Sequence, residues 1–319
     1  MKILTLSQAE HIVDLAVARL MNYTIESDIR NFIEGVSGGV DSTVVCDIGL
    51  IARDRLRALS RPIDIYYVFL DVESHPDDYK RAQEFAALRK FPLHYHDLTN
   101  LYQYSLKFYN IPDGHPFEKI EKGNIKCRTR MMFLMDRAKR YRGVYLDTDD
   151  LSEFYMGFWT RHGDEGDVKL IQELTKDEVY DLAEYLHAPN SILITKPGDG
   201  LGVTANSLAS DQLGMSYLKI DYVMSRFIQF GLDTNGSVDQ LLEVKYLEFA
   251  ISVAKEIDEN WEMVTSVVKQ CLKTAFKRRY GENVANLLPS RLEMGLYRIG
   301  TNRFNELYLA AIKKENENR

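Results

Sequence analysis

The first residues that could do chemistry form a short run of small and polar types, Ser37-Gly38-Gly39-Val40-Asp41-Ser42. A β-prone run precedes it and an apolar-periodic segment follows it, which predicts a strand, a tight loop and a helix. The two glycines let the backbone approach a ligand closely, and a helix that starts here points its unpaired N–H groups and positive dipole end at the loop. We therefore predict an anion site, with phosphate as the ligand.

The spacing of this loop separates it from two common phosphate motifs. It has no Gly-Lys-Ser/Thr ending of a Walker loop, and it is not Gly-x-Gly-x-x-Gly. The pattern Ser-Gly-Gly-x-Asp-Ser resembles instead the pyrophosphate loop of the N-type ATP pyrophosphatases, which cut ATP between its α and β phosphates. The alternative interpretation is a Gly-Gly turn between two buried elements.

Strands alternate with helices through the first half of the chain. This order predicts an α/β fold, a Rossmann-like parallel sheet flanked by helices and joined by right-handed crossovers. Ligands then bind beyond the carboxyl ends of the strands, where the loop, Asp71 and Asp147-Thr148 fall. After the strand that ends at the loop, we expect strands at residues 63–72, 93–98 and 143–146, and helices at 42–59, 76–90, 100–109 and 126–141.

The second half of the chain is expected to be mostly helical. Thr175 and Glu178 have the spacing of a capping box, so Lys176 would stand at the start of a helix. From Ser216 onward the pattern predicts helices at residues 215–230, 238–257 and 259–279. We predict an α/β domain over residues 1–230 and a helical C-terminal extension over residues 231–319, packed on the same domain.

Composition narrows the possible partners. The 319 residues are 45% hydrophobic and 27% charged, with a net charge of −7, which suits a globular protein and argues against a dedicated nucleic-acid binder. Cys46, Cys127 and Cys271 are far apart and indicate neither a zinc site nor a disulfide framework. No apolar run approaches the length of a membrane span. We expect a cytoplasmic protein with no nucleic-acid and no membrane partner.

Further blocks of sequence make the resemblance more specific. Residues 122–131 resemble a Gly-Asn-x-x-Ala-Arg-x-Arg-Met helix, residues 147–153 a Gly-Thr-x-x-x-x-Glu element, and residues 157–167 a Gly-Phe-x-Thr-Lys-Tyr-Gly-Asp-Gly block. Residues 174–176 and 273–279 match two later basic sites. With these blocks the sequence resembles the ammonia-dependent NAD synthetases, which implies a sheet of the adenine nucleotide α-hydrolase-like type. The match runs from about residue 35 to 222 and resumes near residue 272.

The resemblance implies an activity and its participants. In that family ATP adenylates the nicotinate carboxylate of deamido-NAD with release of pyrophosphate, and ammonia then displaces AMP to leave NAD. Mg²⁺ is the implied cofactor and ATP the co-substrate. No glutaminase domain precedes Gly35, which implies free ammonia or ammonia from a separate partner. Family members are homodimers that bind the dinucleotide at the subunit interface, for which the helices after Ser216 are a candidate surface.

The resemblance also assigns roles to residues. Asp41 and Lys176 are implied in catalysis, and Asp41 with Glu153 in metal binding. The implied ATP-binding residues are Gly35, Val36, Ser37, Gly38, Gly39, Val40, Asp41, Ser42, Thr148, Lys176 and Gly198. The implied deamido-NAD-binding residues are Arg128, Arg161, Asp167, Phe276 and Lys277.

Each assignment has a simpler alternative. Asp41 would serve as a helix N-cap, Glu153 as a solvated first-turn glutamate, and Lys176 as an exposed lysine at a helix start. The remaining charged positions would be ordinary surface charges.

Several positions depart from the family pattern. Asp147 stands where a glycine is usual, which would add charge close to the phosphates. Arg161 replaces a lysine, Gly198 a threonine and Phe276 a histidine. Residues 69–73 replace the Arg-Leu-Pro-Tyr-Gly that follows the second strand. Two other functions therefore stay open: another adenylating amido or sulfur transferase of the same group, and a non-catalytic nucleotide-binding protein.

Overall fold

A six-stranded parallel sheet forms the centre of the computed structural model, which describes residues 2–198, 213–279 and 285–317. The strand order is β3-β2-β1-β4-β5-β6, and every neighbouring pair is parallel. This confirms the predicted α/β class. The strands are β1 (Asn31–Gly35), β2 (Asp64–Asp71), β3 (Leu93–Asp97), β4 (Gly143–Asp147), β5 (Val168–Lys169) and β6 (Ala285–Asn286).

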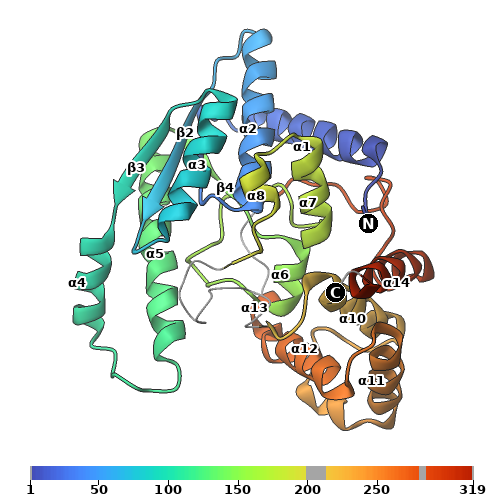
Figure 1. Cartoon of the computed structure of the whole chain (residues 1–319). Coiled ribbons are helices and arrows are strands. Elements are labelled where there is room, and N and C mark those ends of the chain that lie inside the picture. The colour runs from blue at the N-terminus through green and yellow to red at the C-terminus, as the bar shows by residue number, and fades with distance from the viewer. Residues whose placement is uncertain (1, 199–212, 280–284, 318–319) are drawn as a thin grey trace.

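Helices cover both faces of this sheet, as Figure 1 shows. Successive residues of β1 point to opposite faces of the sheet. Phe32 packs in one hydrophobic core with α1, α2, α3 and α7, whereas Ile33 packs in another with α5. Both side chains are fully buried, as expected of a central parallel strand. The helices of this part are α1 (Leu6–Glu26), α2 (Val40–Ala58), α3 (Pro76–Arg89), α4 (Thr99–Tyr109), α5 (Glu118–Arg140), α6 (Leu151–Met156), α7 (Lys176–Tyr185) and α8 (Asn190–Leu193).

Helix α5 differs most from the sequence prediction. It begins at Glu118, whereas the pattern placed its start at residue 126. Gly123 and Asn124 have low helix propensity, so the sequence pattern did not indicate the first two turns of this helix. Glu118 and Glu121 in the first turn favour a helix start, because their charges oppose the positive dipole end.

The C-terminal helices lie beside the sheet, as Figure 1 shows. They form a second hydrophobic core. This core buries the apolar faces of α10, α11, α12 and α14, together with Met156 of α6. The proposed domain division at residue 230 stays a prediction. The elements are α10 (Tyr217–Gln229), the 3₁₀ helix η1 (Val238–Leu242), α11 (Val244–Ile257), α12 (Trp261–Lys273), α13 (Ala275–Arg279) and α14 (Asn302–Glu317).

The chain after α13 returns to the sheet and braces the start of α7. Strand β6 adds to the sheet edge beside β5, and Arg291 then forms a buried ion pair with Glu178, at 2.6 Å. The Tyr308 hydroxyl of α14 hydrogen-bonds the Thr175 hydroxyl. Thr175 and Glu178 form the predicted capping box, so residues about 130 positions apart fix the first turn of α7.

Within the part of the chain that the structure describes, no helix combines the length and apolar composition that a bilayer crossing requires.

Replacement of Arg291 tests this brace. Arg291→Met leaves the Glu178 carboxylate buried without its counter-charge, so we expect a loss of about 3–5 kcal/mol in the free energy of unfolding. Urea titration measures this loss. Arg303→Met is the control: Arg303 and Glu306 form an exposed pair with side chains 75% and 63% accessible, and its loss should cost about 0–1 kcal/mol. Equal effects of the two substitutions would contradict the bracing role.

Candidate active site

The predicted anion loop joins the carboxyl end of β1 to the start of α2. Gly39 is the N-cap of α2, so Asp41 lies in the first helical turn and the N-cap alternative for Asp41 is wrong. Gly38 adopts a φ of 80°, a left-handed conformation that suits glycine. The Ser42 and Thr43 hydroxyls both donate to the Gly39 carbonyl oxygen, and the Ser37 and Ser42 hydroxyl oxygens lie 3.0 Å apart. The loop is therefore held in shape by its own side chains.

The loop opens into a cleft of about 1420 Å³. The ends of β2 and β4, the α5 face and residues of α12 and α13 form its walls, which is where a parallel sheet of this kind places ligands. Of the residues predicted to bind ATP, these line the cleft: Gly35, Val36, Ser37, Gly39, Val40, Asp41, Ser42, Thr148 and Gly198. Gly38 is part of the loop but not of the lining, because it packs against the Asp78 backbone of α3. Lys176 lies behind the lining residues Asp41 and Glu153.

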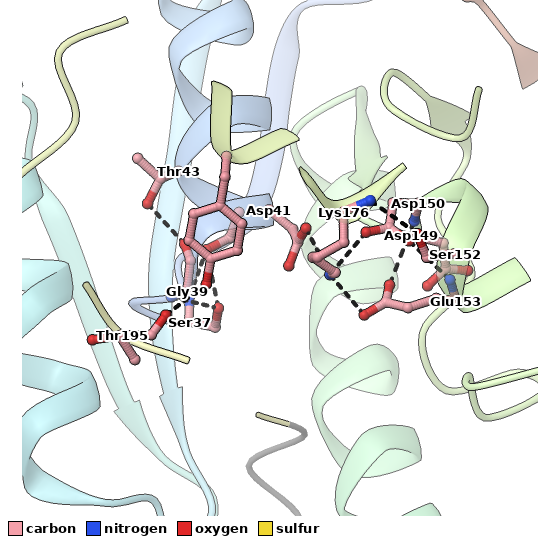
Figure 2. Close-up of polar contacts among 12 residues, drawn as sticks. Ser37, Gly39, Asp41, Thr43, Asp149, Asp150, Ser152, Glu153, Lys176 and Thr195 are labelled. Atoms are coloured by element: carbon pink, nitrogen blue, oxygen red, sulfur yellow. Dashed lines mark hydrogen bonds and ion pairs between the residues drawn. The ribbon is translucent and has the colours of Figure 1, made fainter. Parts of the chain in front are cut away.

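Lys176 joins the loop to the turn after β4. Its ammonium nitrogen lies 2.9 Å from a carboxylate oxygen of each of Asp41, Asp150 and Glu153. Figure 2 shows the lysine reaching between Asp41 on one side and the other two carboxylates on the other. The Lys176 side chain is only 2% exposed, so the interpretation of an exposed lysine is wrong.

The same geometry shows that Glu153 is not the solvated first-turn glutamate of the alternative interpretation. Asp150 and Glu153 form a capping box at the start of α6, and the Glu153 side chain is 18% exposed. One of its oxygens accepts a hydrogen bond from Lys176, at 2.9 Å. Glu153 is therefore a partly buried member of an ion cluster that faces the cleft.

Burial and charge act in opposite directions on the pKa values of this cluster. Burial raises the pKa of Asp150 to about 6, although Lys176 opposes that rise. Burial also raises the pKa of Glu153 well above its usual value. For Lys176, desolvation lowers the pKa, but the three carboxylates outweigh it and the net pKa is raised well above the usual value. Lys176 is therefore a fixed cation at neutral pH.

The implied Mg²⁺ can be tested against these residues. Among the described residues, no three His, Cys, Asp or Glu side chains are arranged to hold a metal ion. The Lys176 ammonium stands between the carboxylates instead. Asp41 and Glu153 nevertheless reach the cleft with hard oxygen donors, and such donors around one cationic position suit Mg²⁺ bound together with phosphates.

The residues predicted to bind deamido-NAD separate into two groups. Lys277 lines the cleft, lies over the Trp159 ring at 5.0 Å and donates to the Gly157 carbonyl, at 2.6 Å. The others lie outside the cleft lining. Arg128 and Arg161 are exposed and adjacent, since Arg128 donates to the Arg161 carbonyl, at 3.3 Å.

The other two members of this set have different surroundings. The Asp167 carboxylate accepts a hydrogen bond from the Tyr145 amide, at 2.8 Å, and so ties the segment before β5 to β4. The Phe276 side chain is 50% exposed. Neither residue is among those that line the cleft.

Asp147, the charged residue at the usual glycine position, points into the protein. It is fully buried, and its two oxygens accept hydrogen bonds from the amides of Asp149 and Gly166, at 2.8 and 2.6 Å. Lys169 lies 3.9 Å away as a buried counter-charge. Asp147 is absent from the residues that line the cleft, so its charge shapes the turn and does not face the phosphate loop.

Sequence reasoning did not assign a role to several residues that line the cleft. They are Arg81, Lys126, Arg130, Asp164 and Tyr180. Lys126 and Arg130 had a usable signal, because a spacing of four residues places both on one face of α5. Arg81 had none, because the residues it contacts across the loop are distant in sequence.

Substitution of Gly38 tests the geometry of the loop. A Cβ at Gly38 would lie 2.3 Å from the Asp78 carbonyl oxygen, and its φ of 80° adds about 1–2 kcal/mol of backbone strain. We expect Gly38→Ala to displace the loop and to abolish binding of ATP, measured by isothermal titration calorimetry. Gly114→Ala is the control, because Gly114 has a φ of 74° and no atom near its Cβ position. Normal ATP binding by Gly38→Ala would contradict the predicted loop contact.

Removal of the Lys176 charge should make stability depend on pH. Without the ammonium, the folded-state pKa values of Asp150 and Glu153 rise further above their unfolded values of about 4. The folded state then binds more protons than the unfolded state, so the free energy of unfolding falls as pH rises through that interval. We expect Lys176→Met to lose more stability at pH 8 than at pH 5, relative to the unsubstituted chain, in urea titrations.

The matched control for this experiment removes a lysine whose partner lies on the same helix as Lys176. Lys2 pairs with Glu184 of α7, and both side chains are more than half exposed, at 59% and 53%. Lys2→Met should therefore change stability little and equally at both pH values. A loss for Lys176→Met that does not vary with pH would rule out the predicted role of its charge.

Comparison with known proteins shows the family of this chain. The family model described as NAD synthase matches residues 12–281. The NH₃-dependent NAD⁺ synthetase of Methanosarcina acetivorans is 28% identical over 235 residues, which cover 70% of this chain and 87% of the relative. The solved NMN synthetase of Francisella tularensis matches with a TM-score of 0.64 at 21% identity, over 86% of this chain and 97% of its own.

A second solved structure supports the same fold. The NAD⁺ synthetase of Burkholderia pseudomallei matches with a TM-score of 0.58 at 20% identity, over 85% of this chain and 89% of its own. The family model covers most of the chain, including the loop, the Lys176 cluster and the cleft walls. The chain therefore belongs to the NAD synthase family of enzymes.

Proposed function

We propose that this enzyme converts deamido-NAD to NAD with ammonia and ATP. In the first step a carboxylate oxygen of the nicotinate attacks the α-phosphorus of ATP, and the bond to the β-phosphate oxygen breaks to release pyrophosphate. In the second step ammonia adds to the activated carbonyl carbon, AMP leaves with the carboxyl oxygen, and one proton is lost to give the amide. The observation that carries this proposal is the placement of the Ser37–Ser42 loop and the Lys176 cluster at one end of a single cleft.

The loop supplies the electrostatics that pyrophosphate release requires. The leaving group carries several negative charges, and preorganised amides with a helix N-terminus stabilise such charge best where water is excluded. The Ser37 and Ser42 hydroxyl groups, whose oxygens lie 3.0 Å apart, help to hold the loop in the shape that presents these amides. Thr148 extends this lining across the cleft at the end of β4.

Asp41 and Glu153 are the residues that would hold Mg²⁺. The ion neutralises phosphate charge when it is bound. Lys176 adds a fixed positive charge beside the same carboxylates, and a compact ammonium suits a phosphate oxygen as a point charge.

Other residues of the cleft suit the dinucleotide acid. Lys126 and Arg130 of α5 and Lys277 of α13 bring cationic groups to the lining, where a carboxylate or phosphate is attracted. Arg128 and Arg161 are exposed beside the cleft, which fits the homodimer that we propose, because an interface would cover both side chains.

The helices after Ser216 stay one proposed dimer surface, although many of their apolar side chains are buried in the second core. Exposed aromatic and aliphatic side chains also gather on α4 and the start of α5, including Tyr104, Phe108 and Ile120. Both surfaces stay candidates for the interface.

We also propose a cytoplasmic location, since Cys46, Cys127 and Cys271 are buried free thiols that suit a reducing compartment.

One assay tests the proposed reaction against its alternatives. Purified protein is mixed with ATP, Mg²⁺, ammonium and deamido-NAD, and AMP, pyrophosphate and NAD are measured. We expect all three products in equal amounts. AMP without NAD would indicate a different acceptor, so parallel reactions contain nicotinate mononucleotide, because one solved structural neighbour is an NMN synthetase. No AMP with any acceptor would favour a non-catalytic nucleotide-binding protein.

Substitution of Asp41 tests its proposed catalytic role. Asp41→Ala removes a carboxylate that faces the phosphates and pairs with Lys176, so we expect pyrophosphate release to fall about 10²-fold or more while the fold is retained. Circular dichroism checks the fold. Asp54→Ala is the control, because Asp54 lies on the same helix with its side chain 64% exposed. Unchanged turnover of Asp41→Ala would remove this residue from the proposed mechanism.

A further inference from the structure

A second cation contacts the phosphate loop from the side of α3. The Arg81 Nε atom donates a hydrogen bond to the Gly38 carbonyl oxygen, at 3.0 Å. Its Nη2 atom donates to the Asp78 carboxylate. The Arg81 side chain is 18% exposed and lines the cleft. None of the sequence blocks that resemble the family contains this residue.

The first turn of α3 packs directly on the loop and fixes this contact. The Asp78 carbonyl oxygen lies 2.3 Å from the position that a Cβ on Gly38 would occupy. Arg81 follows Asp78 by three residues, so both side chains lie on the same face of α3. The guanidinium is therefore held at the loop by backbone packing as well as by its hydrogen bonds.

Arg81 has the chemistry to bind phosphate as well as to brace the loop. A guanidinium has five N–H donors in a planar fork, and contact with Gly38 through Nε leaves the two terminal nitrogens for a second ligand. The Asp78 carboxylate takes up one of them here. A carboxylate and a phosphate oxygen are equivalent partners for such a fork.

Arg81 also shares its electrostatic surroundings with Lys176. Burial is the main influence on the Tyr180 hydroxyl and raises its pKa, whereas the charges of both Lys176 and Arg81 lower it. Tyr180 lines the cleft. The charges of the two cations thus both reach Tyr180, from two different helices, α7 and α3.

We propose that Arg81 binds the pyrophosphate portion of ATP, and that the phosphates replace Asp78 as its partner when the nucleotide enters. This inference rests on the proposed function for the identity of the nucleotide. Arg81 then contacts the leaving group from α3, and it keeps Gly38 in the conformation that the loop requires.

Binding of inorganic pyrophosphate, measured by calorimetry with and without Mg²⁺, tests this inference without any turnover. We expect Arg81→Ala to bind pyrophosphate about tenfold more weakly, because a charge-assisted hydrogen bond is lost. Arg81→Lys should recover part of the affinity, since the charge is kept and the fork is lost. Asp78→Asn should bind pyrophosphate more tightly than the unsubstituted chain, because a competing negative charge is removed.

Arg89→Ala is the matched control on α3. Arg89 pairs with Asp47, at 2.6 Å, and it is not among the residues that line the cleft. It should reduce stability and leave pyrophosphate affinity unchanged. Unchanged affinity in Arg81→Ala would overturn the inference. Should Arg81→Ala fail to fold, Arg81→Lys and Asp78→Asn decide it: full affinity in the first with no gain in the second overturns it.

Kinetics separate this inference from the proposed function. In the reaction with deamido-NAD, Arg81→Lys should raise the KM for ATP and leave the KM for ammonium unchanged, whereas a purely structural defect would alter both. Pyrophosphate binding that depends on Arg81 in a protein that forms no NAD would support the inference and refute the proposed function. Formation of NAD with an unaltered KM for ATP in Arg81→Lys and Arg81→Ala would support the proposed function and refute the inference about Arg81.

Discussion

The buried ammonium of Lys176 among three carboxylates is the interaction on which the site depends. Asp41 comes from the phosphate loop, and Asp150 and Glu153 come from the turn after β4. Each carboxylate would be costly to bury alone, because desolvation penalises an unpaired charge heavily. The lysine therefore ties the α2 end of the cleft to the β4 end, and its charge opposes the rise in the pKa values of Asp150 and Glu153 that burial causes.

The rest of the fold holds that lysine in place. The Lys176 backbone amide donates to the Ser152 hydroxyl, which in turn donates to the buried Asp221 carboxylate of α10. The capping box at Thr175 and Glu178 is braced by Tyr308 and by Arg291, both from the C-terminal part of the chain. Residues of the C-terminal region that do not themselves line the cleft thus help to fix the position of the central cation.

The sequence was sufficient for features that lie within one contiguous segment. The phosphate loop was predicted because its glycines, hydroxyls and Asp41 occur together, between a strand and a helix that each have a clear period. The parallel sheet was predicted because each of its longer strands has a clear local pattern and is followed by a helix. Strands β5 and β6 were missed because a strand of two residues shows no alternation of apolar and polar side chains. The start of α5 was missed because Gly123 and Asn124 weaken the local helix pattern.

Features that depend on distant contacts were not available from the sequence. The burial of Lys176 requires Asp41, which is 135 residues away, and the contact of Arg81 with Gly38 spans 43 residues. Asp147 is the most instructive case, since its charge at a usual glycine position suggested conflict with phosphate. The Asp149 and Gly166 amides and Lys169 instead satisfy the carboxylate inside the protein.

This distinction bears on how the family pattern can vary. A substitution that adds a charge beside a phosphate site is tolerated when the backbone turns that charge toward internal donors, because the electrostatic potential in the cleft then depends on the lining residues and not on the motif position. In this chain the Asp147 carboxylate is buried and bonded to internal donors, so it does not line the cleft. Arg81, which lies outside the sequence blocks of the family, adds a cation to the lining. The chemistry of the cleft therefore follows from which side chains the packing directs into it, and the motif alone does not determine them.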